Sequence, residues 1–195
     1  MVDIAGRKDL REANLKGTDL RGKNFQGADL EKADLIETDL REANLEGANL
    51  KGADLFKANL REANLEGAYL IWADLRWVQL EAAHLGGAHL EGARLEEANL
   101  EKADLKGAYL EGANLINADL GEANLERATL KGANLEGANL EGAKLETALL
   151  EEAYGLSPDQ LSKVKTLYNA KLDEKLLLAL KEKCPALFEK PEYKE

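Results

Sequence analysis

The chain has 195 residues, a formal net charge of −11 and a single cysteine. This acid surplus argues against direct binding to nucleic-acid phosphates, which requires an excess of Lys and Arg, and one cysteine excludes an internal disulfide framework. The N-terminal MVDIAGRKDL has no apolar core of signal-peptide length, and no run reaches the ~18 apolar residues of a membrane helix. We therefore expect a cytoplasmic protein that binds no membrane, although removal of a targeting segment would leave the same sequence.

A five-residue repeat runs from residue 10 to residue 150. Every fifth position is Leu except Phe25, the position two residues earlier is Ala with five exceptions, and Asp or Asn mostly precedes the Leu. On a straight helix, successive leucines would lie about 140° apart and form no stripe. On a straight strand, every second Leu would point to the opposite face. A chain that turns a corner every five residues, with Leu and Ala inward, resolves both conflicts.

Such a chain coils, and its coils are expected to stack about 4.8 Å apart through main-chain hydrogen bonds. Gly, Asn and Asp recur where corners require them. Tyr69, His89 and Tyr109 are spaced by 20 residues, as are several glycines, but a spacing of 25 is equally frequent among the glycines. Periodicity alone therefore leaves the number of sides open.

The motif Ala-Asp/Asn-Leu-X-X, over roughly residues 8–154, resembles the pentapeptide repeat family. The resemblance implies an all-β solenoid, a right-handed quadrilateral β-helix with four pentapeptides per coil and with the Leu and the preceding Ala inside. Twenty-nine repeats would make a little over seven coils, and a rod about 35 Å long.

The inward position usually holds the small residue Ala. Three of its exceptions lie close together near the N-terminus, at Lys8, Thr18 and Lys23. A long polar side chain fits there only if the first coil is open to water, and frayed end geometry is the simpler explanation. The alternative is an open mouth that receives a partner or another copy of the chain. Val78 is the one other bulky exception.

Aromatic and apolar residues replace the usual Glu, Lys, Arg or Gly at several outward positions in the middle of the repeat. Because Trp and Tyr are enriched at interface hot spots, we interpret them as a partner-binding patch. Alternatively, the rings lie flat over neighbouring coils and only cover corners. The patch comprises Tyr69, Ile71, Trp72, Trp77, His89 and Tyr109.

The sequence gives no support for a catalytic, metal or cofactor site. His84 and His89 are five residues apart, on adjacent sides of the coil, without a third ligand. The aspartates at 34, 54 and 74 form a column that calcium could bridge, but we expect each carboxylate to bond its own turn. There is no nucleophile elbow or phosphate loop, and a filled column offers no concave pocket. We therefore expect that the chain is not an enzyme.

The repeat is expected to end at residue 155, leaving a helical cap and tail over 156–195. Ser157, Pro158 and Gln160 form a helix start with a capping box. The apolar residues at 161, 164, 167 and 168 predict one helix, and those at 176, 177 and 180 predict a second that Pro185 ends or bends. Leu187 and Phe188 are expected to anchor the tail. The cap is either a lid on the last leucines or a dimerisation surface, as in gyrase-protecting members of the resembled family.

These features predict a non-enzymatic scaffold or protein-binding module of unknown partner, either a monomer or a dimer formed through the C-terminus. The alternative is an acidic mimic of duplex DNA that regulates DNA gyrase or another DNA-handling enzyme, as certain pentapeptide repeat proteins do. Residues 81–155 hold fifteen acidic and six basic residues, which supports the alternative. The positive row of Arg21, Arg41 and Arg61 argues against it.

Overall fold

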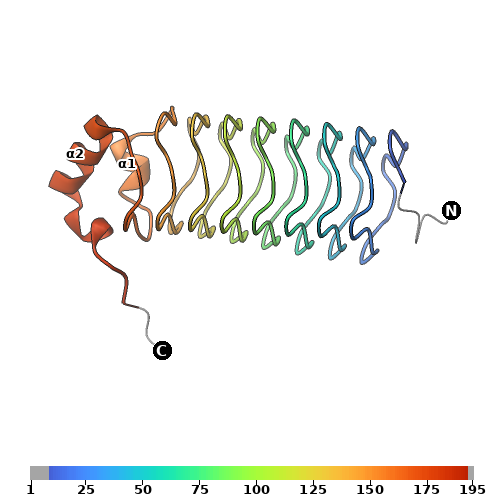
Figure 1. The fold of residues 1–195 in the computed structure, drawn as a ribbon, viewed down its shortest axis with the longest axis horizontal. Coiled ribbons are helices and arrows are strands. Elements are labelled where there is room, and N and C mark those ends of the chain that lie inside the picture. The colour runs from blue at the N-terminus through green and yellow to red at the C-terminus, as the bar shows by residue number, and fades with distance from the viewer. Residues whose placement is uncertain (1–8, 193–195) are drawn as a thin grey trace.

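The structure is a computed structural model that describes residues 9–192. Parallel bridges join residues twenty positions apart, from Asp9 with Asp29 to Asn134 with Tyr154. Each coil therefore contains four pentapeptides, which answers the question that the glycine spacing left open. The coils stack into a rod (Figure 1), and the predicted right-handed quadrilateral β-helix is confirmed.

Main-chain hydrogen bonds join each coil to the next. The N–H of Leu15 donates to the carbonyl of Asp34 at 2.8 Å, and the N–H of Asp34 donates to the carbonyl of Ala13 at 2.9 Å. A third bond, from the N–H of Ala13 to the carbonyl of Leu10 at 3.1 Å, closes the corner between two sides. A fourth bond runs from the third residue of the turn to the next coil, as from the N–H of Gly17 to the carbonyl of Ile36 at 2.9 Å, and Asp or Asn side chains accept N–H groups two residues later, as Asp34 does from Ile36. Repetition of these bonds satisfies most backbone N–H groups although each side is only a few residues long.

Each corner is a tight turn whose third residue has positive φ. Gly67 has φ of 61°, and the same conformation recurs at Trp72 with 61° and Trp77 with 60°. A turn with positive φ only at its third residue is of type II, which explains the frequent glycine. A non-glycine residue there costs roughly 1–3 kcal/mol, so burial of the core and the hydrogen bonds between coils must compensate for this strain.

The core is a column of Leu and Ala that fills the interior of the coil. From Ala28 to Leu150, every repeat Leu and every Ala that precedes it is at most 2% exposed. Val78 fits the small inward position and is fully buried. Thr38 is fully buried as well, and its hydroxyl donates to the carbonyl of Leu15 at 3.1 Å. A polar group is thus tolerated inside because it is hydrogen-bonded.

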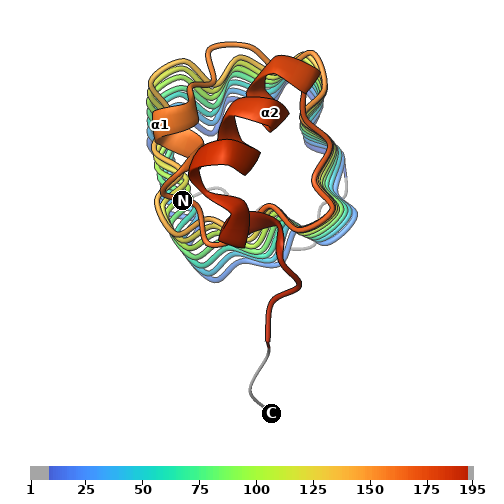
Figure 2. The same ribbon diagram turned by 90° about the vertical axis from the view of Figure 1, so that its left-hand side faces the viewer.

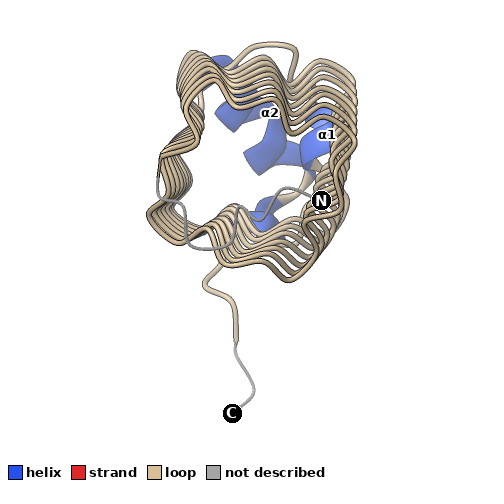
Figure 3. Cartoon of the chain, turned by 90° about the vertical axis from the view of Figure 1, so that its right-hand side faces the viewer, coloured by secondary structure: helices blue, strands red, loops and turns tan. Residues whose placement is uncertain are grey.

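At the N-terminal end the inward positions become accessible. Lys23 is exposed and Thr18 is half-buried, with its hydroxyl donating to the carbonyl of Leu15 at 2.6 Å. The prediction that polar side chains at these positions reach water is confirmed for Lys23. Lys8 lies outside the described residues. Figure 3 shows the coils from this end, with the C-terminal helices behind them.

The first helix is shorter than the sequence predicted. α1 spans Pro158–Leu161, and the predicted capping box between Ser157 and Gln160 is present. The prediction that this helix continues through residue 168 is wrong, because α1 ends at Leu161. Bridges of Lys144 with Thr166 and of Leu149 with Lys171 show instead that residues 163–172 add further coil beyond the boundary expected at residue 155. Their apolar residues at 164, 167, 170 and 172 are buried, and Thr166, which forms one of the two bridges, is β-branched and so favours extended backbone over a helix.

The second helix, α2 (Glu174–Lys183), crosses the end of the coil (Figure 2). It ends before Pro185, as predicted, and the 3₁₀ helix η1 follows over Pro185–Phe188. Leu180 is fully buried, and Leu187 and Phe188 pack against the core. The carbonyl of Leu187 also accepts the N–H of Leu167 at 2.7 Å. These contacts are those expected of a lid on the last coil.

Candidate partner-binding surface

Three consecutive coils place aromatic rings in register on one side of the rod. Tyr69 stacks on His89 with a centroid distance of 4.9 Å and an interplanar angle of 10°. His89 stacks on Tyr109 at 4.6 Å and 12°. The spacing of 20 residues therefore places the three rings one coil apart on a single face. We call residues 69–72, 89–92 and 109–112 the aromatic strip, because each segment holds one ring of this ladder and the corner after it.

The indole of Trp72 extends the strip at its corner. A Cβ added at Gly92, one coil further along, would lie 3.3 Å from Cε3 of Trp72. The ring therefore rests on the neighbouring corner, as the alternative interpretation of the patch expected. Even so, 70% of Trp72 is exposed. The ring both covers a corner and presents a large apolar surface to solvent.

The structure brings together five of the six residues of the predicted patch. Tyr69, Trp72 and Tyr109 are exposed, and Ile71 and His89 are half-buried beside them. Trp77 lies one corner further along the chain, separated from Trp72 by the side formed by residues 73–75, and is 47% exposed. Trp77 is therefore a neighbour of the aromatic strip and not a member of the ladder.

Phe56 is an aromatic residue near the strip that the sequence analysis did not single out. The guanidinium of Arg76, one coil further along, lies 5.3 Å from the ring centroid, and the ammonium of Lys57 lies 5.2 Å from it. Both distances are typical of cation–π contacts. The signal was available, because Phe56 is the one aromatic residue of a corner column that holds charged residues at positions 16, 76, 96 and 136 and Ile at 36 and 116.

The carboxylates of the strip are poorly compensated. Oε1 of Glu91 lies 3.1 Å from Nδ1 of His89. Within the described part of the chain, the other oxygen of Glu91 and one oxygen of Glu111 are buried without a hydrogen-bond partner. Burial without a partner raises the energy of a charged oxygen, so this surface favours a positive group nearby.

At several other corners, arginines pair with carboxylates, although Oε2 of Glu96, outside the strip, is also buried without a hydrogen-bond partner among residues 9–192. Nη2 of Arg21 lies 2.6 Å from Asp19, Nη2 of Arg41 lies 2.6 Å from Asp39, and Nε of Arg61 lies 3.3 Å from Glu81. The hydrogen bond from Arg21 lowers the pKa of Asp19 to about 2. The predicted positive row is thus a row of ion pairs.

The aspartate column at positions 34, 54 and 74 bonds its own turns, as predicted. Oδ1 of each accepts the N–H two residues later, at 3.1, 3.0 and 3.3 Å respectively. Arg76 and Arg94 also contact Asp74. Over residues 9–192, no group of three or more His, Cys, Asp or Glu side chains is arranged to hold a metal ion. His84 is exposed on a different side from His89.

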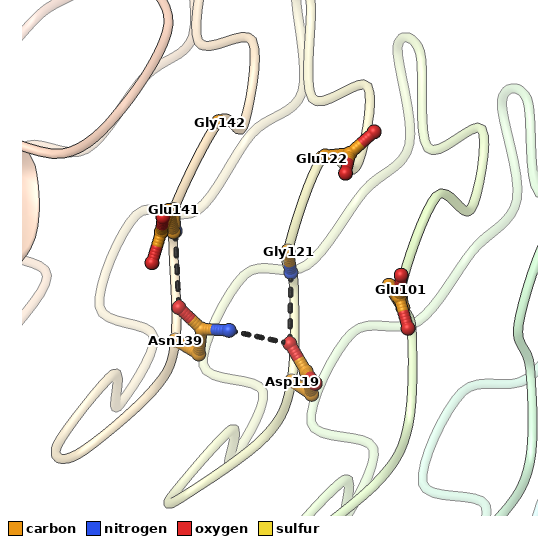
Figure 4. Close-up of a pocket in the computed structure, with 7 residues that line it drawn as sticks. All are labelled: Glu101, Asp119, Gly121, Glu122, Asn139, Glu141 and Gly142. Carbon is orange, nitrogen blue, oxygen red and sulfur yellow. Dashed lines mark hydrogen bonds between the residues drawn. The ribbon is translucent and has the colours of Figure 1, made fainter.

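A shallow groove of about 300 Å³ lies on another part of the rod, where Gly121 leaves a gap in a corner column. Oδ1 of Asp119 accepts the N–H of Gly121 at 3.0 Å and the amide of Asn139 at 2.8 Å. The bordering carboxylates of Glu101, Glu122 and Glu141 point in different directions (Figure 4). The groove therefore follows from a missing side chain, and its central carboxylate, that of Asp119, is already hydrogen-bonded to its own turn and to the next coil.

Comparison with known proteins establishes the family. The model of pentapeptide repeats matches residues 9–47, 33–71, 73–112 and 108–146, with eight copies. The chain belongs to the pentapeptide repeat family. A comparison with curated proteins gives no match. None of the described helices is long and apolar enough to cross a membrane.

Solved structures of other pentapeptide repeat proteins are similar to this chain. HetL of the cyanobacterium Nostoc, involved in heterocyst differentiation regulation, is 31% identical over 86% of this chain and 90% of its own, with a TM-score of 0.39. The Nostoc protein alr5209 is 41% identical over 51% of this chain and 72% of its own, with a TM-score of 0.36. QnrB1, a plasmid-mediated fluoroquinolone resistance protein, is 20% identical over 91% and 93%, with a TM-score of 0.45.

Proposed function

We propose that this pentapeptide repeat protein is a non-enzymatic scaffold and that a partner protein docks on the aromatic strip. The observation that carries the proposal is the 70% exposure of Trp72 beside the ladder of Tyr69, His89 and Tyr109. Exposed Trp and Tyr side chains are costly to leave in water and are enriched at interface hot spots. The filled interior leaves the exterior as the recognition surface.

The rigidity of the strip supports the same proposal. Both faces of His89 are stacked, and Trp72 already rests on the next corner. Binding would therefore immobilise few additional side chains, which lowers the entropic cost of association. A partner with a complementary surface would gain from this preorganisation without any change in the rod.

Affinity capture tests the proposal with one matched control. The intact chain, Trp72→Ala and Trp77→Ala are immobilised and exposed to lysate of the source organism. We expect Trp72→Ala to lose a protein that the other two retain. Trp77 has the same positive φ at a neighbouring corner, so its replacement controls for loss of an indole. Equal recovery of every bound protein by all three chains would contradict the proposal.

Regulation of a DNA-handling enzyme by duplex mimicry is a second candidate. It is favoured by the acid surplus of residues 81–155, together with the pairing of Arg21, Arg41 and Arg61 to carboxylates, which reduces their positive field. A supercoiling assay with purified gyrase tests it. Inhibition or protection at micromolar protein is expected if the candidate is right, and no effect would remove it.

Composition supports three further proposals about the setting of this function. We infer a cytoplasmic location, no direct contact with nucleic acid or membranes, and either a monomer or a dimer formed through the C-terminal end. Sedimentation of the purified chain beside a variant with Leu178→Asp, on the exposed side of α2, tests the last of these. Equal molar masses for both, at the monomer value, would exclude the dimer.

A further inference from the structure

We infer that the aromatic strip recognises an arginine-bearing segment of the partner protein, an inference that rests on the proposed function. In this arrangement a guanidinium lies on the open face of the Trp72 indole. Glu91 and Glu111, on the two following coils, supply the negative charge beside it. The inference specifies the chemistry of the partner at the site already proposed.

The indole offers a suitable platform for a planar cation. One face of Trp72 rests on the corner at Gly92, while 70% of the residue is exposed. Among side chains, Trp gives the strongest attraction to a cation above its ring. The rod already shows the same chemistry internally, since the guanidinium of Arg76 lies 5.3 Å from the centroid of Phe56.

The charge of the strip is negative, and its one internal contact for a carboxylate is that of His89 with Oε1 of Glu91 at 3.1 Å. Its three segments, YLIW, HLEG and YLEG, contain two Glu and no Lys or Arg. Oε2 of Glu91 and Oε2 of Glu111 are buried and have no hydrogen-bond partner among residues 9–192. The lysine on the next coil of that corner, Lys131, contacts Glu152 at 3.2 Å. A cation from outside would lower the energy of these two carboxylates.

Arginine fits this site better than lysine or an anion. Its planar, weakly hydrated guanidinium stacks on an aromatic face and keeps its charge, whereas the lysine ammonium is compact and more strongly hydrated. Phosphates would be repelled by Glu91 and Glu111, which disfavours a nucleic acid at this surface. Because part of the attraction is between charges at the surface, salt should weaken it.

Fluorescence polarisation with short labelled peptides tests the inference. The probes are acetylated and amidated Gly-Arg-Gly-Arg-Gly, the same peptide with Lys, and the same peptide with citrulline, which has the shape of Arg without its charge. We expect the Arg peptide to bind the intact chain about tenfold or more tightly than the citrulline peptide, with weaker binding at high salt. The Lys peptide should rank between them.

Variants of the strip and matched controls show where the peptide binds. Glu91→Gln with Glu111→Gln, and separately Trp72→Ala, should each weaken binding of the Arg peptide about tenfold. Glu101→Gln with Glu141→Gln removes the same charge at another corner column, and Trp77→Ala removes an indole outside the strip, so both controls should bind normally. The inference is overturned if Arg and citrulline peptides bind equally, if neither binds, or if the control variants lose as much affinity as the strip variants.

The peptide assay and the affinity capture together distinguish failure of the arginine inference from failure of the proposed function. If the Arg peptide fails but Trp72→Ala still loses a partner in affinity capture, the strip binds a protein through other chemistry, and only the arginine inference is wrong. If Trp72→Ala also retains every partner, the proposed function fails as well.

Discussion

The regular coils and the C-terminal end of this chain bury their leucines by different means. From Leu10 to Leu135 the N–H of every repeat Leu or Phe donates to the carbonyl nineteen residues later, and the bridges within residues 9–154 are all twenty residues apart. After residue 155 the spacing lengthens, from Lys144 to Thr166, because α1 is inserted before the last coil. The repeated motif is thus sufficient to add one coil after another, whereas the end of the rod requires residues that do not belong to the repeat.

Gly155 is where the two regions meet. It occupies the position of a repeat Leu, has φ of 75°, and a Cβ there would collide with the backbone of Glu136. The backbone at Gly155 lies so close to the preceding coil that there is no space for a Cβ atom.

The largest effect is expected in the regular core. Leu135→Ala should lower the free energy of unfolding by roughly 2–5 kcal/mol, because Leu135 is fully buried in a column that cannot collapse easily. Leu178→Ala, in α2, is the control, since Leu178 is 61% exposed. Denaturant unfolding followed by circular dichroism measures both, and similar losses for the two variants would contradict the inward column.

Gly155→Ala should cost roughly 1–3 kcal/mol, since it adds a collision to the strain of positive φ. Gly107→Ala provides the comparison, because Gly107 has φ of 65° and nothing within 4 Å of an added Cβ. The difference between their thermal melts isolates the close approach to Glu136. Equal melting temperatures would show that the approach is unimportant.

Ser157→Ala should cost about 1 kcal/mol by removing the cap of α1. The Ser157 hydroxyl accepts the N–H of Gln160 at 3.2 Å, and the amide of Gln160 donates to the carbonyls of Leu135 and Ala138 at 3.0 and 3.1 Å. Hydrogen exchange should therefore accelerate in residues 156–172 and remain slow in the middle coils. Uniform acceleration along the rod would contradict a locally specified end.

The smallest effect is a pH dependence that belongs to the coils. Burial opposes ionisation of Asp74, but hydrogen bonds from Arg76 outweigh it and hold the pKa of Asp74 below its ordinary value. A lowered pKa in the folded state stabilises the fold above the unfolded value of about 3.9, and this contribution is lost as pH falls below it. Asp74→Asn should flatten the decline in stability between about pH 5 and pH 2. Acid unfolding of the intact chain and of Asp74→Asn, followed by circular dichroism, measures this decline, and equal slopes for the two chains would contradict the contribution of Asp74.

The sequence was sufficient to predict the regular coils because each corner repeats the same local requirement. Leu every fifth residue excluded a straight helix and a straight strand, and the small residue two positions earlier indicated the inward column. The number of sides could not be predicted from glycine spacing, since positive φ is also adopted at corners by residues such as Trp72 and Glu97. Pairing between coils, which is a long-range property, determined it.

The end was predicted only where its signals are local. The capping box at Ser157 and the stop at Pro185 are confirmed. The apolar spacing of Leu161, Val164 and Leu167 also fits a helix, and only contact with the preceding coil selects the further coil over residues 163–172. In the candidate site, the spacing of 20 between the rings gives the ladder once the coil has four sides, whereas the contact of Trp72 with the corner at Gly92 depends on side-chain packing.

Site-specific photo-crosslinking tests most directly whether the aromatic strip is the recognition surface. A photoreactive phenylalanine analogue is placed at Trp72 or at Glu122, which has positive φ at the same position of another corner. We predict that the analogue at 72 captures one dominant protein and that the analogue at 122 does not. Equal capture of that protein at both positions, or at 122 alone, would contradict the account.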